Sequence, residues 1–138
     1  MGDYFVDTAY HVAIVDPKDD LHAAALRLAG RLARDSSASF LTSDIVLAEF
    51  LTFLSGRGGS IRGVAVNYVD DITREANVTV VRLTRALFDA GLELYRRRAD
   101  KTYSMTDCIS MVICRERRIS DILTGDHDFE QEGFRILL

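Results

Sequence analysis

The chain has 138 residues, of which 48% are hydrophobic, and a formal net charge of −4 at pH 7. This length and composition fit one domain over residues 1–138 with an ordinary hydrophobic core. A strand-like segment begins almost at once and no apolar run is long enough to cross a bilayer, so we expect neither a signal peptide nor a membrane span. Cys108 and Cys114 have no metal-ligand or redox spacing. We therefore expect reduced core thiols and a cytoplasmic protein.

The negative net charge conceals a basic stretch at residues 91–118. Seven basic and four acidic residues fall there, which gives the stretch a local charge of +3. Two interpretations remain open, because clustered arginines can bind RNA phosphates or can be solvated helix ends. The arginines expected to bind RNA are Arg96, Arg97, Arg98, Arg115, Arg117 and Arg118.

The first half of the chain predicts strands at residues 4–6 and 40–42 and helices at residues 9–15 and 19–34. The first helix ends at Asp16-Pro17. The second is amphipathic, and a polar loop follows it at residues 35–38. Its apolar side consists of Leu21, Ala24, Ala25, Leu28 and Leu32. Asp7 follows the first strand, where it could be a plain helix N-cap.

A helix at residues 44–54, capped by Ser43, is apolar nearly all round and is therefore expected to be buried. Glu49 lies in its middle. A lone carboxylate is costly to bury unless it is paired or bound to a metal. Because the same face of this helix offers no cation, the sequence favours a functional role for Glu49 over a structural ion pair.

The next segments follow a glycine-rich break at residues 56–59. We expect a helix at residues 60–76, a β-branched strand at 78–83, a helix from Thr84 to about residue 98, and a last strand at 134–137. The first of these helices has an inner stripe of Val64, Tyr68 and Ile72, and the second has one of Leu87, Gly91, Leu94 and Tyr95. The alternation predicts a three-layer α/β/α fold with a central parallel sheet of about five short strands.

Residues 103–129 read YSMTDCISMVICRERRISDILTGDHDF and contain three elements in succession. A helix begins between Ser104 and Thr106, a buried strand lies at residues 122–124, and an acidic turn follows at 125–128. Asp107 falls in the first turn of the helix, and Asp126 lies just past the strand. Ser104 and Asp107 have the spacing of a capping box, so a purely structural role for Asp107 also remains open.

Four acids are expected to share one place: Asp7, Glu49, Asp107 and Asp126. The carboxyl ends of parallel strands meet at one edge of the sheet, where α/β proteins bind ligands. Two carboxylates ~5 Å apart repel by roughly 3 kcal/mol at an effective dielectric of ~20, so such a cluster needs protons or a cation. Oxygen ligands without cysteine or clustered histidine favour Mg²⁺ or Mn²⁺. Asp128 is either a further ligand or a cap of its own turn.

At these residues the chain resembles the PIN-domain nucleases, in particular the VapC toxins of toxin–antitoxin pairs. The similarity lies in F-V-D-T at residues 5–8, A-E-F at 48–50, Y-S-M-T-D-C-I-S at 103–110 and L-T-G-D-H-D-F at 123–129. One departure is Ala9, where such toxins often carry serine or asparagine.

This resemblance implies a Mg²⁺- or Mn²⁺-dependent endoribonuclease with the acid quartet Asp7, Glu49, Asp107 and Asp126. Polar support would come from Thr8, Ser104, Thr106 and Thr124. The resemblance also implies a tRNA or rRNA substrate, a homodimer, and a small VapB-like antitoxin that inserts a basic side chain into the acidic pocket.

Mechanistically, we expect metal-activated water to attack the RNA phosphodiester without a covalent enzyme intermediate. His127 adjoins the acids, but a loop histidine there is expected to be a bystander. Two alternatives remain open: a housekeeping RNA-processing nuclease, and a catalytically silent PIN-like domain that binds RNA or protein. A receiver-like phospho-acceptor domain is disfavoured, because the sequence lacks an acid pair after the first strand and a lysine after a late one.

Overall fold

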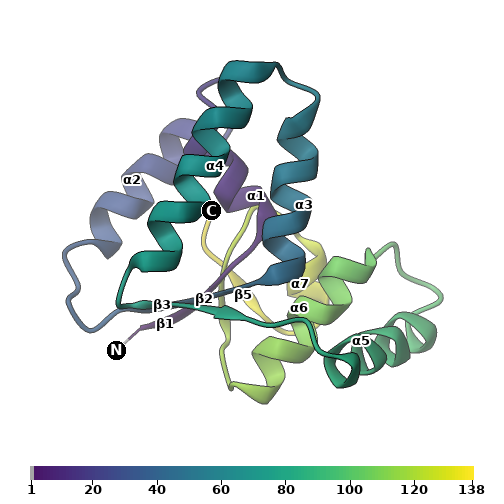
Figure 1. Ribbon diagram of the computed structural model, residues 1–138. Helices are drawn as coiled ribbons and strands as arrows, with labels where there is room; N and C mark the ends of the chain where they lie inside the picture. Colours follow the sequence, from purple (N-terminus) through teal and green to yellow (C-terminus); the bar gives the residue numbers. More distant parts are fainter. Residues whose placement is uncertain (1) are drawn as a thin grey trace.

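The computed structural model describes residues 2–138 and contains one parallel sheet of five strands (Figure 1). The strands are β1 (Asp3–Val6), β2 (Ser39–Ser43), β3 (Val78–Val81), β4 (Asp121–Leu123) and β5 (Arg135–Ile136). Their order across the sheet is β3-β2-β1-β4-β5, and every neighbouring pair is parallel. The predicted α/β fold with a parallel sheet of short strands is confirmed.

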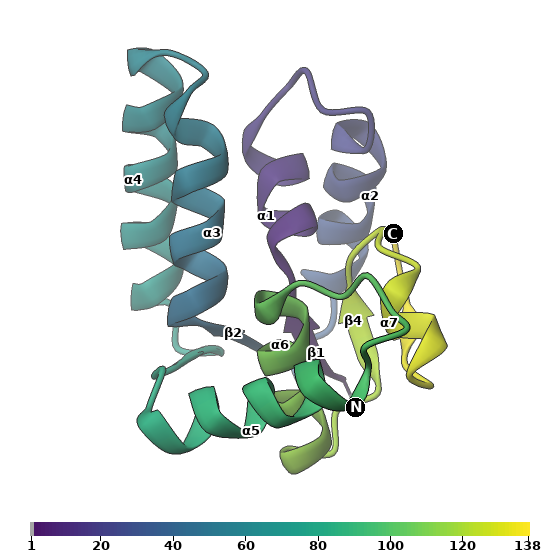
Figure 2. The same ribbon diagram turned by 90° about the vertical axis from the view of Figure 1, so that its right-hand side faces the viewer.

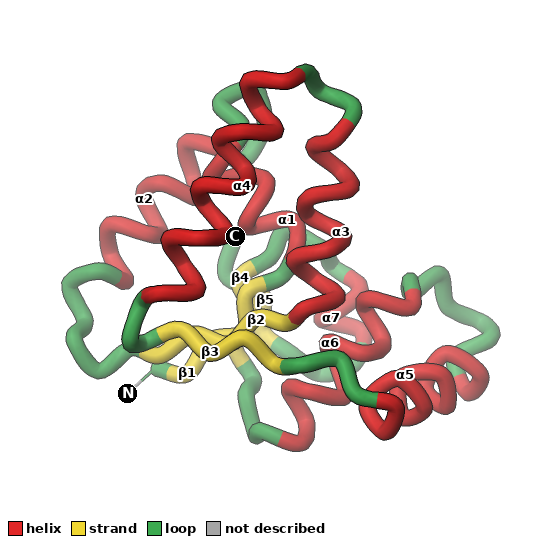
Figure 3. Tube along the Cα trace, in the orientation of Figure 1, coloured by secondary structure: helices red, strands yellow, loops and turns green. Residues whose placement is uncertain are grey.

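Seven helices surround this sheet in the described part of the chain (Figure 3). They are α1 (Thr8–Val15), α2 (His22–Leu32), α3 (Asp44–Ser55), α4 (Gly59–Arg74), α5 (Arg85–Arg97), α6 (Met105–Glu116) and α7 (Asp128–Gln131). Within residues 2–138, none of them combines the length and the apolar character that crossing a bilayer requires.

Alternating side chains of the strands make a separate core on each face of the sheet. Phe5 of β1 and Ile122 of β4 pack in one cluster with apolar residues of α5 and α6. Val6 and Leu123, the next residue of each strand, pack in another cluster with residues of α1 and α2. Helices thus cover both faces, which confirms the predicted three layers.

Helix α4 pairs with α3, and the two helices run side by side away from the sheet (Figure 2). A third apolar cluster joins this pair to α1 through Val12, Val15, Phe50, Leu54 and Ala65. Together with the sheet, the pair places the middle of α3 beside the carboxyl end of β1.

Three helices start at the capping residues that the sequence indicates. The hydroxyl of Ser43 accepts a hydrogen bond from the amide of Val46 at 3.2 Å, and that of Thr84 accepts one from Leu87 at 3.1 Å. Ser104 caps α6 in the same way. Each bond satisfies an amide that the first turn leaves without a helical partner, so local chemistry fixes these helix starts.

Two expectations about helix burial are wrong. The expected burial of α3 is incomplete, because the helix extends beyond the sheet and leaves Leu51 37% and Phe53 51% exposed. On α4 the expected inner residue Val64 is 50% exposed, and Ala65 packs inward instead. The helix is therefore turned so that Ile61, Ala65 and Tyr68 face α1 and α3.

Two smaller corrections concern α2 and α5. Helix α2 begins at His22 rather than Asp19, since the Asp19 carboxylate accepts a hydrogen bond from the Leu21 amide at 3.0 Å and forms a turn before the helix. Tyr95 of α5 was expected inside but is exposed. The inner face of α5 is narrower than predicted because Gly91 lies directly on Ile109 of α6, where a Cβ would collide.

Candidate active site

The four acids predicted to share one place line a single cleft of about 360 Å³ at the carboxyl edge of the sheet. Asp7 follows β1, Glu49 lies in the middle of α3, Asp107 lies in the first turn of α6, and Asp126 follows β4. Thr8, Ser104 and Phe53 are among the other residues that line this cleft. The structure thus brings the quartet together, with Asp7 and Asp126 following neighbouring parallel strands and the other two acids on helices.

Asp7 occupies the N-cap position of α1, but its carboxylate makes no capping hydrogen bond. Instead, Oδ2 of Asp7 accepts a hydrogen bond of 2.8 Å from the hydroxyl of Thr124, and the residue is only 4% exposed. Burial raises the pKa of Asp7 from 3.8 to about 7, against the opposing effect of the Thr124 hydrogen bond. The carboxylates of Asp107 and Glu49 raise this pKa further. The backbone amide of Thr8 lowers this pKa, but the net shift is upward, so the ionised carboxylate lacks sufficient positive compensation in the fold.

Asp107 combines the structural and the functional interpretations of its sequence position. Its backbone amide donates to Oγ of Ser104 at 3.0 Å, and its Oδ2 accepts from the Ser104 amide at 2.9 Å. This reciprocal pair is the predicted capping box. Burial, partly offset by the Ser104 hydrogen bonds and reinforced by the Asp126 charge, raises the pKa of Asp107 from 3.8 to about 6. The capping box thus aims the side chain at the other acids.

The acidic turn is built by hydrogen bonds that begin at Thr124, a fully buried residue just beyond β4. Oγ1 of Thr124 accepts from the amide of Asp126 at 3.1 Å, while Oδ1 of Asp126 accepts from the amide of Asp128 at 2.9 Å. Oδ1 of Asp128 accepts from Gln131 at 3.2 Å. One threonine hydroxyl therefore connects Asp7 to the turn that carries two more acids.

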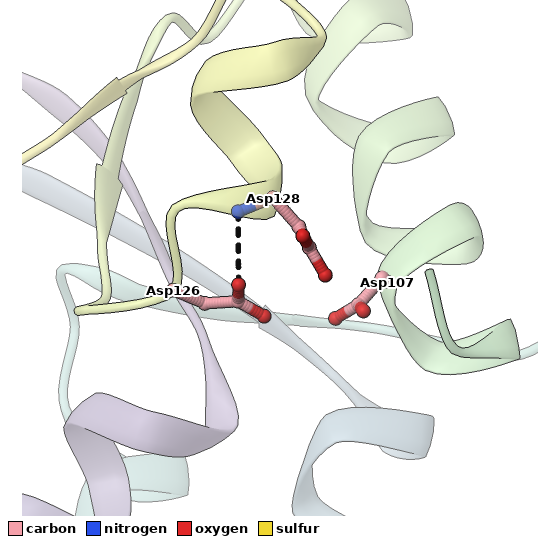
Figure 4. A group of neighbouring side chains, drawn as sticks. All are labelled: Asp107, Asp126 and Asp128. Atoms are coloured by element: carbon pink, nitrogen blue, oxygen red, sulfur yellow. Dashed lines mark hydrogen bonds between the residues drawn. The ribbon is translucent and has the colours of Figure 1, made fainter. Parts of the chain in front are cut away.

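Three aspartates form the tightest group of acids described (Figure 4). One carboxylate oxygen from each of Asp107, Asp126 and Asp128 lies within 4.8 Å of the others. Burial and the charge of Asp126 raise the pKa of Asp128, while Lys101 opposes the shift. The sequence did not decide whether Asp128 is a metal ligand or a cap of its own turn. In the structure, its carboxylate lies beside those of Asp107 and Asp126 and also accepts a hydrogen bond from Gln131 of the same turn.

The remaining predicted site residues differ in their contacts. Glu49 is half-buried and makes no ion pair within residues 2–138, in line with the absence of a nearby cation in the sequence. The buried hydroxyl of Thr8 has no hydrogen-bond partner in the described part and lies at the cleft. Thr106 is buried, but no hydrogen bond joins it to an acid within the described residues. His127 is exposed and pairs with Glu130 at 2.5 Å.

Two arginines expected at RNA phosphates are tied to a residue that the sequence did not single out. Glu132, whose side chain is 5% exposed, binds Arg98 Nε at 2.9 Å and Arg115 at 3.0 Å, and also accepts from the Tyr103 hydroxyl at 2.9 Å. Arg96 pairs with Glu93 at 2.6 Å. The Glu132 contacts link the segments beside α5, α6 and α7, so Arg98 and Arg115 hold the fold together. The RNA-binding role of all six arginines stays a prediction, and Arg97, Arg117 and Arg118 are exposed and make no ion pair within residues 2–138.

The chemistry of the donor set fits a hard divalent cation. The polar side chains that line the cleft are all carboxylates and hydroxyls, and no lining residue is a cysteine or a histidine. Mg²⁺ and Mn²⁺ prefer oxygen ligands of this kind. Burial and the charges of neighbouring carboxylates raise the pKa of both Asp7 and Asp107. A bound cation would stabilise the ionised form of both side chains.

Comparison with known proteins assigns the family. The family model for the PIN domain matches residues 4–134. The chain belongs to the PIN domain family. A sequence search among curated proteins finds no match.

Two solved structures resemble this PIN domain over almost their full length. The Mycobacterium tuberculosis toxin VapC20, described as a sarcin-ricin loop cleaving toxin, aligns with a TM-score of 0.83 at 29% identity over 96% of each chain. A chain of VapBC2 from Rickettsia felis, bound to a DNA fragment from its promoter, aligns with a TM-score of 0.66 over 98% of this chain and 97% of that one. At 14% identity the second similarity shows the fold alone. The family match and the VapC20 similarity support the predicted VapC-like PIN nuclease.

Proposed function

We propose that this PIN domain is a Mg²⁺- or Mn²⁺-dependent endoribonuclease of the VapC kind, which hydrolyses RNA phosphodiester bonds in the cytoplasm. The observation that carries the proposal is the cleft in which Asp7, Glu49, Asp107 and Asp126 meet. Four carboxylates crowded at one edge of a sheet serve no structural purpose that neutral side chains would not serve better. The catalytically silent alternative has no use for this costly arrangement.

In the working enzyme these four acids, with Asp128 as a fifth candidate, would hold the cation. A bound Mg²⁺ or Mn²⁺ supplies a water of lowered pKa and stabilises negative charge on the phosphate and the leaving oxygen. The protein contributes the orientation of its ligands. Thr124 holds the Asp7 carboxylate and the Asp126 amide at once, and Ser104 holds Asp107. His127 is exposed and does not line the cleft, so it is not a candidate general base.

The similarity to VapC20, at 29% identity, supports a proposal for the substrate class. VapC20 is described as a sarcin-ricin loop cleaving toxin. We propose a structured rRNA or tRNA for this chain also, with the exposed Arg97, Arg117 and Arg118 contacting phosphates. Such contacts position an RNA strand without reading its bases.

We propose a small VapB-like antitoxin as the physiological partner and a homodimer as the assembly. The R. felis VapBC2 chain in the comparison carries the name of a toxin–antitoxin complex, although it supports the fold alone. An uncompensated acidic cleft can accept a basic side chain, and the exposed Phe53 at its rim offers apolar contact. Expression of this chain alone should slow bacterial growth, and co-expression of such an antitoxin should restore it. Normal growth with abundant soluble protein would favour the housekeeping RNA-processing alternative.

RNA cleavage by purified, demetallated protein tests the proposed function. We expect no cleavage of a sarcin-ricin loop hairpin or of tRNA in chelator, and cleavage after Mg²⁺ or Mn²⁺ is restored. Asp107→Asn should abolish this activity, whereas Asp20→Asn, an exposed position outside the cleft, should retain it. Undiminished cleavage in chelator would overturn the metal mechanism, and no cleavage of any RNA under any metal would overturn the nuclease proposal.

A further inference from the structure

A buried histidine lies one helical turn beyond Asp7 and outside the residues that line the cleft. His11 is 2% exposed, and both of its ring nitrogens have partners from other elements. Nδ1 lies 2.7 Å from the hydroxyl of Tyr68 on α4, and Nε2 lies 3.0 Å from Oγ1 of Thr42 on β2. Oγ1 of Thr42 in turn lies 3.0 Å from the carbonyl oxygen of Val6. These contacts form a continuous chain from α4 to the residue before Asp7.

The direction of every hydrogen bond in this chain can be assigned. The Val6 carbonyl can only accept, so the single hydroxyl proton of Thr42 is donated to it. Thr42 must then accept from Nε2–H of His11. A neutral imidazole carries one N–H, so Nδ1 accepts from the Tyr68 hydroxyl. Burial lowers the pKa of His11 to about 3, which keeps the ring neutral at physiological pH.

This series of hydrogen bonds ends at Val6, where the hydrogen bonding between β1 and β2 stops. The pairing of β1 with β2 runs only to Phe5 and Leu41, so the Val6 carbonyl lies past the last paired residues. On the other side, the amide of Asp7 donates to the carbonyl of Leu123 at 3.2 Å. The peptide bond between Val6 and Asp7 is therefore fixed from both neighbours, by the backbone of β4 and by the side chain of Thr42.

We propose that Tyr68, His11 and Thr42 form a positioning relay that fixes the Val6–Asp7 peptide and thereby the direction of the Asp7 carboxylate. In its effect on catalysis this inference rests on the proposed function, but the geometry of the relay does not. None of the three side chains touches substrate, and His11 exchanges no proton during the reaction. Since residues that orient a metal ligand commonly change affinity or activity 10- to 100-fold, the relay has measurable consequences at the cleft.

The geometry is tested first in the metal-free protein, without reference to activity. Nitrogen-15 NMR of His11 should show a neutral Nε2–H tautomer from pH 5 to pH 8. Thr42→Val removes the hydroxyl at nearly constant shape, and it should accelerate hydrogen exchange at the Asp7 amide by about tenfold or more relative to Phe5 in the same strand. An Nδ1–H tautomer, or an unchanged Asp7 amide in Thr42→Val, would overturn the relay.

The consequence for the site is tested by Mn²⁺ binding and RNA cleavage below the unfolding temperature of each variant. Thr42→Val should weaken Mn²⁺ binding and lower kcat by about tenfold, with KM for RNA changed less than about twofold. Thr42→Ser keeps the hydroxyl and should restore both within about threefold. Tyr68→Phe should act in the same direction more weakly, and its effect should not add fully to that of Thr42→Val because both belong to one relay.

Leu87→Ala in α5 is the control for lost stability alone, because Leu87 is buried in the cluster on the face of the sheet opposite Val6. It should lower the unfolding temperature and leave Mn²⁺ affinity unchanged. If wild type cleaves RNA and Thr42→Val matches it in kcat and Mn²⁺ affinity, the relay has no role in positioning. If wild type neither binds Mn²⁺ nor cleaves RNA while the NMR results hold, the proposed function fails and the relay stands as a device that fixes Asp7.

Discussion

Replacing Asp7 by asparagine should stabilise the metal-free protein while it destroys the activity. Asp7 is buried beside Asp107 and Glu49, and its ionised form is unfavourable in the fold. Asparagine has nearly the same shape, and its side-chain oxygen can still accept the hydrogen bond from Thr124. The substitution therefore removes a buried charge and leaves the surrounding contacts in place.

The magnitude follows from the pKa of Asp7, which rises from 3.8 to about 7 on folding. A group with a raised pKa in the folded state stabilises the protein below pH 3.8, and that stability is lost as pH rises to about 7. At about 1.4 kcal/mol per pH unit, the whole loss is roughly 4 kcal/mol, and about 3 kcal/mol of it falls between pH 5 and pH 8. Asp7→Asn has no such loss, so its advantage over wild type should grow by about 3 kcal/mol across this interval.

Urea denaturation in chelator at pH 5 and pH 8 measures this difference. Asp20→Asn is the control, because the same chemical change at an exposed position should alter stability by less than about 0.5 kcal/mol. Adding Mn²⁺ at pH 8 should stabilise wild type far more than Asp7→Asn, since the ion binds the folded state through the acids. If the stability of Asp7→Asn relative to wild type is the same at both pH values, the fold does not disfavour the ionised form of Asp7.

Three further predictions concern the turn, the core and the Glu132 contacts. Asp126→Asn should lose nearly all RNA cleavage. Asp128 does not line the cleft, so Asp128→Asn should keep a measurable fraction of the cleavage rate, and a higher metal concentration should increase that fraction. If a metal titration shows Asp128→Asn to be the less active variant, Asp128 is the more important ligand. Gly91→Ala should lower the free energy of unfolding by about 1–3 kcal/mol, because the new Cβ collides with Ile109 of α6. Gly63→Ala should raise it by about 0.5–1 kcal/mol, because Gly63 of α4 has open space around it. Thermal unfolding measures both changes. Glu132→Gln should lower the free energy of unfolding by about 1–3 kcal/mol at pH 7, because it removes the charge of a buried carboxylate that pairs with two partly exposed arginines. Because the pKa of Glu132 is lowered in the fold, the full difference in stability between wild type and Glu132→Gln should be present above pH 4.5 and should shrink as the pH falls further. An equal difference at pH 7 and pH 3 would contradict this prediction.

Features set by neighbouring residues could be predicted from the sequence. The starts of α3, α5 and α6 were predictable because Ser43, Thr84 and Ser104 cap the helices that follow them directly. The meeting of Asp7 and Asp126 was predictable because both follow parallel strands, whose carboxyl ends share one edge. In these cases the distance along the chain is short or the topology leaves one arrangement.

Features that depend on distant contacts could not be predicted. The apolar sequence of α3 indicated burial, but it could not show that the helix extends past the sheet and leaves Phe53 exposed. Glu132 gave no signal, because its partners lie up to 34 residues away in the chain. The same holds for His11, whose hydrogen bond to Tyr68 spans 57 residues. The position of Asp128 depends on the turn that Thr124 and Asp126 build together, and that turn has no simple sequence signature.

In the proposed mechanism, the cleft acids hold the divalent ion at which RNA is cleaved. A single Mn²⁺ titration of the demetallated protein tests it, with bound ion followed by electron paramagnetic resonance and RNA cleavage measured in the same samples. Binding and cleavage should rise together, and Asp126→Asn should lose both while Asp20→Asn keeps both. Cleavage that reaches its full rate before any Mn²⁺ is bound, or Mn²⁺ binding that survives in Asp126→Asn with cleavage intact, would contradict the account.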